Sequence, residues 1–141
     1  MDIEALKPFL GELAELSGQV ILKYYRRGDL GIEHKADDSP VTVADKAAEE
    51  VIIRRIREKF PEHGLLAEES GNDKEGADWT WVIDPIDGTK SFIGGVPLFT
   101  TLIGLLHEGR PVLGCIHQPV LGQLMVGDNK TTTLNGEPVR I

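Results

Sequence analysis

Two carboxylates stand three positions apart at the end of an apolar run, within the sequence Asp-Pro-Ile-Asp-Gly-Thr at residues 84–89. Pro85 fixes its own φ angle and forces Asp84 into an extended conformation. Gly88 allows a tight backbone path after the second carboxylate. This geometry would aim both carboxylates and the Ile86 carbonyl into one space. Hard oxygen donors of this kind suit Mg²⁺, which takes few carboxylates alongside water and substrate phosphate.

Three further acidic residues stand near the ends of other predicted elements. Glu68 and Glu69 follow a short apolar run, and Asp45 lies in the first turn of a predicted helix. The whole chain is acidic, with 15 basic and 23 acidic side chains and a net charge of −8. Because clustered carboxylates repel one another, a bound cation would explain their conjunction.

Each of these features taken alone also has a structural explanation. Asp-Pro and Asp-Gly are turn formers, so residues 84–89 could simply end a buried strand. Paired glutamates such as Glu68 and Glu69 usually lie on a solvated face. Asp45 is equally well explained as a charge that favours a helix N-terminus. Only the conjunction favours a site for a metal ion.

Two helices are expected to position these residues. Apolar side chains spaced along one stripe predict a helix over residues 3–27. Because of Pro8, either its regular part begins near Lys7 or its first turn is kinked. A second helix should begin at Thr42 with a capping-box-like sequence and end at Pro61.

Strands dominate the rest of the chain. A short strand is expected at residues 31–35, and Thr89 could cap a short helix. Short apolar runs separated by turn sequences predict further strands at residues 64–67, 79–83, 98–107, 111–117, 123–126 and 131–134. Two helices followed by a largely antiparallel sheet is an α+β layout, and a chain of 141 residues suffices for one domain.

Composition narrows the range of partners and compartments. The acidity argues against nucleic acid or an anionic membrane as a partner, because phosphate groups select basic surfaces. No apolar run approaches the roughly 18 residues of a membrane span, and the first residues lack the pattern of a signal peptide. The single cysteine, Cys115, indicates a reducing compartment. We therefore expect a cytoplasmic protein.

The remaining reactive residue types are expected to be structural. The basic run at residues 54–57 is interpreted as a solvated face balanced by Glu49, Glu50 and Glu58, and Cys115 as a small core residue. The histidines share no metal-ligand spacing and should be structural or surface residues: His34, His63, His107 and His117.

Several of these motifs together resemble the signature of the inositol monophosphatase family. They are Glu-Glu-Ser at residues 68–70 and Trp-Val-Ile-Asp-Pro-Ile-Asp-Gly-Thr at residues 81–89. Residues 39–45, preceded by Lys35, are similar to the family's upstream motif. Members of this family are Mg²⁺-dependent, lithium-sensitive phosphomonoesterases with a layered α-β-α-β-α fold. The resemblance implies that residues 1–141 form the N-terminal metal-binding domain of such an enzyme.

Within the family, the sequence is similar to the histidinol-phosphatase branch. Lys90 and Ser91 stand where inositol phosphatases usually carry Thr and Asn, and residues 116–122 and 131–136 also resemble that branch. It hydrolyses L-histidinol phosphate in histidine biosynthesis. The alternatives are inositol 1-phosphate, 3′-phosphoadenosine or fructose-bisphosphate substrates, and, outside enzymes, an inactive metal-binding or assembly module. The family commonly forms homodimers, so we expect one for the full-length enzyme.

The resemblance also implies a set of metal ligands. Glu68, Asp84 and the Ile86 carbonyl would hold a first Mg²⁺. Asp84 would bridge to a second ion that Asp87 also binds. Two such ions can activate a water molecule and stabilise the leaving alkoxide.

By the same resemblance, neighbouring residues would handle water and phosphate. Glu69 would hold a metal-bound water, and Asp45 with Thr89 would orient or deprotonate the attacking water. The amides of Gly88 and Thr89, at the start of a short helix, would receive phosphate oxygens.

One expected motif has no counterpart in this sequence. The family carries a further Trp-Asp motif that completes the second metal site, but the tryptophans here, Trp79 and Trp81, are followed by Thr80 and Val82. The C-terminal domain is thus expected to be absent from this chain, which should show little turnover alone. The missing half would also leave apolar surface uncovered.

Overall fold

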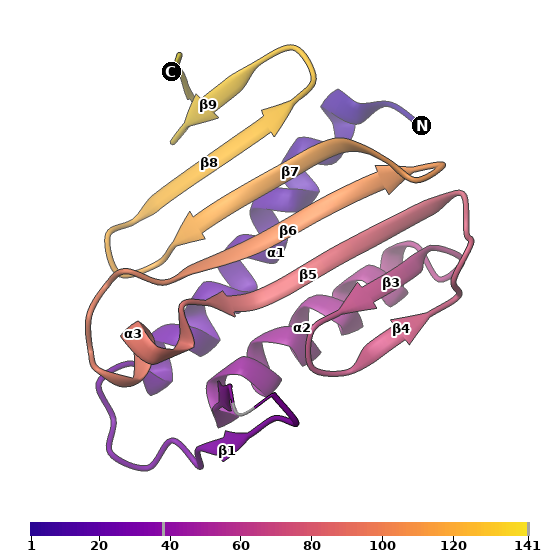
Figure 1. Cartoon of the computed structure of the whole chain (residues 1–141). Helices are drawn as coiled ribbons and strands as arrows, with labels where there is room; N and C mark the ends of the chain where they lie inside the picture. Colours follow the sequence, from indigo (N-terminus) through magenta and orange to yellow (C-terminus); the bar gives the residue numbers. More distant parts are fainter. Residues whose placement is uncertain (38, 141) are drawn as a thin grey trace.

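The computed structural model describes residues 1–37 and 39–140, and places two long helices on one face of a β-sheet (Figure 1). The helices are α1 (Ile3–Tyr24), α2 (Val43–Lys59) and the short α3 (Thr89–Ile93). The strands are β1 (Glu33–His34), β2 (Pro40–Val41), β3 (Gly64–Ala67), β4 (Gly71–Asp73), β5 (Trp79–Asp87), β6 (Thr100–His107), β7 (Arg110–Gln118), β8 (Gln123–Asp128), β9 (Thr132–Leu134) and β10 (Glu137–Pro138).

The main sheet has eight strands in the order β10-β9-β8-β7-β6-β5-β3-β4, and β1 pairs with β2 apart from it. Strands β3 and β5 run parallel, with Ala67 opposite Ile83, whereas the other pairs in the described residues are antiparallel. This confirms the predicted α+β fold with a largely antiparallel sheet. The parallel pair matters most for function, because it brings the carboxyl ends of β3 and β5 to the same edge.

Helix α1 begins earlier than predicted. The Asp2 side chain accepts a hydrogen bond from the Glu4 amide at 3.0 Å, so the helix is capped there and begins at Ile3. It continues through Pro8, where the missing N–H costs one intrahelical bond without breaking the helix. The expectation that the regular part begins near Lys7 was therefore wrong, as was the predicted end at residue 27.

Helix α2 begins as the sequence predicted. Thr42 is its N-cap and forms a reciprocal capping box with Asp45, in which the Thr42 amide donates to Asp45 Oδ2 at 2.7 Å. Facing α1, Arg55 pairs with Glu12. The helix ends at Lys59, just before Pro61.

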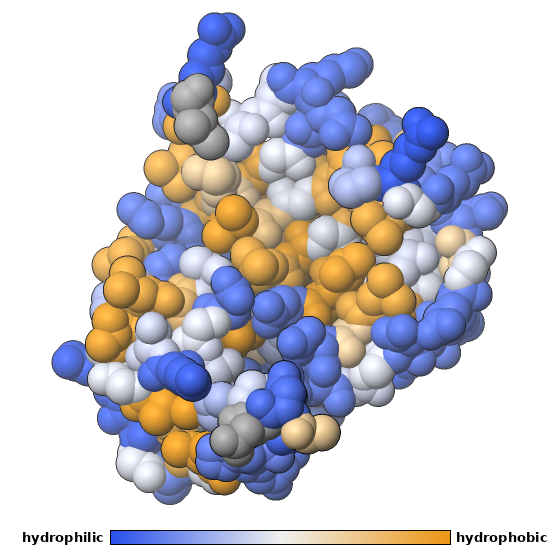
Figure 2. Space-filling model, in the orientation of Figure 1, coloured by the Kyte–Doolittle hydropathy of each residue, from blue (hydrophilic) through white to orange (hydrophobic). Residues whose placement is uncertain are grey.

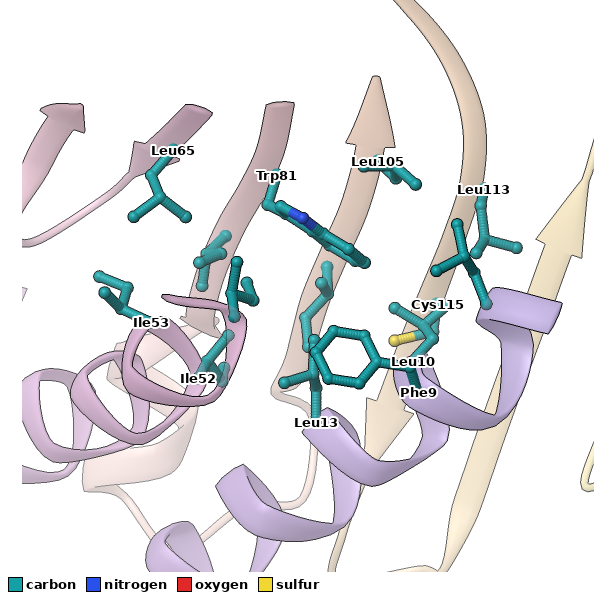
Figure 3. Packing of buried hydrophobic residues seen from close by; sticks show 14 of the residues in the cluster. Phe9, Leu10, Leu13, Ile52, Ile53, Leu65, Trp81, Leu105, Leu113 and Cys115 are labelled. Atoms are coloured by element: carbon teal, nitrogen blue, oxygen red, sulfur yellow. The ribbon is translucent and has the colours of Figure 1, made fainter. Parts of the chain in front are cut away.

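The core lies between the two long helices and the sheet. Figure 3 shows Leu10 and Leu13 of α1 close to Trp81 of β5, all three fully buried. Burial of each such side chain contributes roughly 1.5–3 kcal/mol. A second buried cluster, including Ile21 and Phe92, lies beside α3. Cys115 belongs to the main core, as expected, and burial raises the pKa of its thiol to about 12.

Several strand assignments differ from the sequence expectation, among them β2, which was not predicted. β5 continues to Asp87 instead of ending at residue 83, and its register against β6 shifts between Asp84 and Asp87. Pro85 lies inside this irregular stretch, where the absence of an N–H is tolerated. Strand β4 was not predicted, because it is a short edge strand without apolar alternation.

The face of the sheet away from α1 and α2 exposes apolar side chains, seen as orange areas between blue rims in Figure 2. Val82 and Ile116 are 36% and 46% exposed. They border a groove of about 490 Å³ whose lining includes Leu102 and Met125. In the part of the chain that the structure describes, no helix is long and apolar enough to cross a bilayer.

Candidate active site

A cleft of about 290 Å³ opens at the edge where β3 and β5 end. The Glu68 amide donates to the Ile83 carbonyl at 3.2 Å, which extends the parallel pairing and sets Glu68 beside Asp84. The residues that line the cleft come from the β1–β2 hairpin, the ends of both strands and α3: Lys35, Ser39, Pro40, Glu68, Glu69, Asp84, Ile86, Asp87, Gly88, Thr89 and Lys90. The fold thus brings most of the predicted site residues to one place.

Asp45 joins this site from α2 through Thr89. The Thr89 hydroxyl lies 3.1 Å from Asp45 Oδ1 and 3.2 Å from the Ile86 carbonyl oxygen, so it can donate to either. The other oxygen, Asp45 Oδ2, accepts from the amide and hydroxyl of Thr42 at 2.7 and 2.5 Å. The buried Asp45 carboxylate therefore both caps α2 and contacts Thr89.

The turn into α3 depends on glycine. Gly88 has a φ of 93° and is the N-cap of α3, whereas Thr89 is its first residue. A Cβ atom at position 88 would lie 2.8 Å from the Leu98 carbonyl oxygen. The expectation that Thr89 caps the short helix was wrong, because its hydroxyl is directed to Asp45 and Ile86 instead.

The cleft concentrates negative charge. Burial, with the charges of Glu68 and Asp87, raises the pKa of Asp84 from 3.8 to about 6. Burial also raises the pKa of Glu69, and the nearby Lys35 ammonium partly opposes this rise. The Lys35 ammonium lies 3.0 Å from Glu69 Oε1 and 3.6 Å from Glu68 Oε1. Lys35 therefore provides a positive charge within the acidic cluster.

The donors in the cleft fit a hard divalent cation by chemistry. Within residues 1–37 and 39–140, no three carboxylate, imidazole or thiol side chains are gathered closely enough to hold a metal ion. Mg²⁺ needs fewer, because it is usually bound by one or two carboxylates and keeps several waters. Glu68, Asp84 and Asp87 offer such oxygens around one cleft, and the raised pKa of Asp84 reflects burial together with repulsion by Glu68 and Asp87, both of which a bound cation would offset.

Sequence reasoning misplaced one charged residue of this region. Glu49 was expected on a solvated face, but it is fully buried, whereas Glu50 is exposed and pairs with Arg54. The Glu49 carboxylate accepts hydrogen bonds from the turn that follows β3. Its position one turn after Asp45, on the same side of α2 as the buried Ile52 and Ile56, was the available signal.

His63 is buried and His117 is half-buried, and neither lines the cleft. His63 Nδ1 accepts a hydrogen bond from Trp81 Nε1 at 3.0 Å. The histidine thus satisfies a buried indole N–H, which is a structural role.

The fold and the cleft define an α+β protein with an acidic site at the parallel ends of two strands. The inositol monophosphatase family profile matches residues 2–141. The chain belongs to the inositol monophosphatase family.

Several relatives cover nearly the whole chain. It is 50% identical over 130 residues to the chloroplastic bifunctional phosphatase IMPL2 of Arabidopsis thaliana, covering 90% of this chain and 37% of the relative. It is 46% identical over 131 residues to a histidinol-phosphatase of Chlorobaculum parvum, covering 92% and 51%. Inositol monophosphatase 3 of Solanum lycopersicum is 35% identical over 136 residues, covering 92% and 50%.

Solved structures share the fold. A suhB protein from Bartonella henselae has a TM-score of 0.92 at 27% identity, covering 97% of this chain and 54% of the other. An IMPase from Thermotoga maritima has a TM-score of 0.89 at 30% identity, covering 99% and 54%. The chain spans about half the length of most of these relatives.

Proposed function

We propose that this chain supplies the metal-binding half of a Mg²⁺-dependent phosphomonoesterase that acts on a small phosphorylated alcohol. The observation that carries the proposal is the convergence of Glu68, Asp84 and Asp87 on one cleft with the Asp45–Thr89 pair. Phosphoryl transfer requires mainly positioning and charge neutralisation, which such a cleft can provide.

Glu68, Asp84 and the Ile86 carbonyl are the proposed ligands of a first Mg²⁺, and Asp84 with Asp87 of a second. When bound, Mg²⁺ supplies charge neutralisation for the phosphate and lowers the pKa of a bound water. Before it binds, Lys35 partly neutralises Glu68 and Glu69.

The proposed work of the protein side chains is to orient the attacking water. When Thr89 donates its single hydroxyl proton to Asp45 Oδ1, its oxygen lone pairs are left to accept a hydrogen bond from water in the cleft. Asp45 is held in place through its other oxygen by Thr42. Glu69 is proposed to hold a second water, and the amides of Gly88 and Thr89 to receive phosphate oxygens.

L-Histidinol phosphate is the proposed substrate. Support comes from Lys90 and Ser91 after the Asp-Gly-Thr sequence and from the 46% identity to a histidinol-phosphatase. Inositol 1-phosphate is the main alternative, because a Dictyostelium discoideum inositol monophosphatase is 40% identical over 128 residues. A homodimer of the full-length enzyme and a cytoplasmic location stay predictions from the family resemblance and the composition.

The test is phosphate release from histidinol phosphate and inositol 1-phosphate with Mg²⁺, using this chain with and without a family C-terminal half. Turnover of histidinol phosphate only when both halves are present would support the proposal. Turnover of inositol 1-phosphate instead would overturn the substrate but keep the phosphatase. No release by a folded, completed protein would favour a metal-binding module without catalysis.

A further inference from the structure

The turn that follows β3 donates hydrogen bonds to a single buried carboxylate, that of Glu49. Glu49 Oε1 accepts from the Glu69 amide at 2.8 Å, and Oε2 accepts from the Ser70 amide at 2.6 Å and the Ser70 hydroxyl at 2.5 Å. Glu49 has no exposed surface. Each of its three partners donates, so both carboxylate oxygens act only as acceptors.

A carboxylate that was buried here only to fill space would destabilise the fold. Removing an ionised carboxylate from water costs free energy that only good hydrogen-bond partners offset. Burial raises the pKa of Glu69, and the nearby charge of Glu49 adds to this rise, so the two carboxylates also repel each other. An apolar residue would fill the space without either cost, but it would leave two backbone amides of the turn without an acceptor.

Glu49 lies one helical turn after Asp45 on α2. Helix α2 therefore contacts both sides of the cleft. Asp45 contacts Thr89 on one side, and Glu49 contacts the turn after β3 on the other. We infer that Glu49 is a positioning residue, which fixes the turn after β3 so that Glu68 and Glu69 face Asp84 across the cleft. This inference rests on the proposed function of the cleft.

The hydrogen-bond geometry makes glutamine an unsuitable substitute. In Glu49→Gln, one of the two oxygens becomes an NH₂ group that must face either the Glu69 amide or the Ser70 amide, so one donor always opposes another. Ser70→Ala removes only the hydroxyl contact and leaves both backbone amides on Glu49. Glu50→Gln is the matched control, because Glu50 is the next residue on α2 and is exposed.

The first measurement is hydrogen exchange of the Glu69 and Ser70 amides in the metal-free chain, at a temperature where every variant is folded. Glu49→Gln should speed this exchange at least tenfold while the amides within β3 keep their rates, and Glu50→Gln should match the wild type. Unchanged exchange at Glu69 and Ser70 in a folded Glu49→Gln variant would overturn the inference. If Glu49→Gln does not fold, Glu49→Asp, which keeps both carboxylate oxygens but shortens the side chain by one methylene, must still speed exchange at these two amides, whereas Ser70→Ala, which leaves both amide contacts, should not.

The second measurement is Mn²⁺ binding by electron paramagnetic resonance, with Mn²⁺ as the probe of the divalent site. Glu49→Gln should weaken affinity about 10- to 100-fold, as loss of a group that orients a ligand usually does. Equal affinity in Glu49→Gln and wild type would overturn the inference while the proposed metal site stands. No binding by the wild type would instead contradict the proposed function, and the exchange measurement would still decide whether Glu49 fixes the turn.

Discussion

The surroundings of Asp84 disfavour its charged form, because burial and the charges of Glu68 and Asp87 raise its pKa from 3.8 to about 6. The folded chain therefore binds a proton more tightly than the unfolded chain, and without metal its stability falls as pH rises from about 4 through 6. Asp84→Asn should remove this loss. The variant should be more stable than wild type by about 1–2 kcal/mol at pH 8, after allowance for solvent screening, and by less near pH 4.

Urea unfolding in the presence of a chelator, at pH 4 and pH 8, measures this difference. A variant that is less stable than wild type at pH 8 would contradict burial and charge repulsion as the cause. In the completed enzyme, meaning this chain together with a family C-terminal half, the same substitution should abolish phosphate release, because the proposed function makes Asp84 a ligand of both ions. Surviving activity would contradict that role.

Thr89 offers a second test at the scale of one side chain. Thr89→Val keeps the branched shape but removes the hydroxyl that reaches Asp45 Oδ1. In the completed enzyme we expect kcat to fall about 10²- to 10⁴-fold, the usual range for loss of a group that moves or orients a proton. Thr89→Ser, which keeps the hydroxyl, should retain most of the activity. Equal kcat values for the two variants would argue that the hydroxyl does not act in the reaction.

Most side chains that line the cleft were expected together from the sequence, because they follow the ends of apolar runs and because the family resemblance groups them. The parallel pairing of β3 with β5, which brings two of these ends together, was not predicted. Glu68 and Asp84 meet because of this pairing. Glu49 could not be assigned with the same ease, since a glutamate beside an arginine-rich stretch has the composition of a solvated face. Its role depends on the turn after β3 lying against the N-terminal half of α2, and the local sequence does not contain this tertiary contact.

At the scale of elements, local signals predicted α2 and most strands, whereas the irregular elements escaped. The capping box of Thr42 and Asp45 lies wholly within a few residues, so the sequence contains it. The extension of β5 to Asp87 depends on pairing with β6, which lets a strand continue past Pro85 through a shifted register. Among the described residues β4 pairs its backbone with β3 only, and its own residues give no strand pattern.

The buried His63, which joins the end of α2 to β5, should make the free energy of unfolding fall at acidic pH. His63 accepts from Trp81 Nε1 and stacks on Phe60 at a centroid distance of 4.5 Å. Burial lowers its pKa below 6.5, only partly opposed by Glu62. The unfolded chain thus binds the proton more tightly, and the stability present above pH 6.5 is lost as pH falls below it.

In His63→Gln, the amide oxygen can still accept from Trp81 but does not titrate. Between pH 8 and pH 5 this variant should lose about 1 kcal/mol less stability than wild type. Denaturant unfolding followed by tryptophan fluorescence measures both slopes. His107→Gln is the control, because His107 is partly exposed and stacks on Trp79 at the sheet end, with ring centroids 3.9 Å apart. Identical pH slopes for His63→Gln and wild type would exclude His63 as the cause.

At the scale of the whole molecule, the two faces of the sheet differ. One is covered by α1 and α2, and the other exposes Val82 and Ile116 beside an apolar groove (Figures 1 and 2). Contiguous exposed apolar surface favours association in water. We therefore expect this chain, studied alone, to self-associate with rising concentration.

Ile116→Lys tests whether that face is responsible, since it places a charge in the apolar area where β7 crosses the centre of the sheet. The substitution should shift the onset of association, measured by sedimentation velocity, to a severalfold higher protein concentration, because desolvating a lysine opposes contact between apolar surfaces. Leu22→Lys is the matched control, since Leu22 is also 46% exposed but lies on α1. If Leu22→Lys delays association as much as Ile116→Lys, added charge alone accounts for the effect. If only Ile116→Lys delays it, the exposed apolar face of the sheet causes the association.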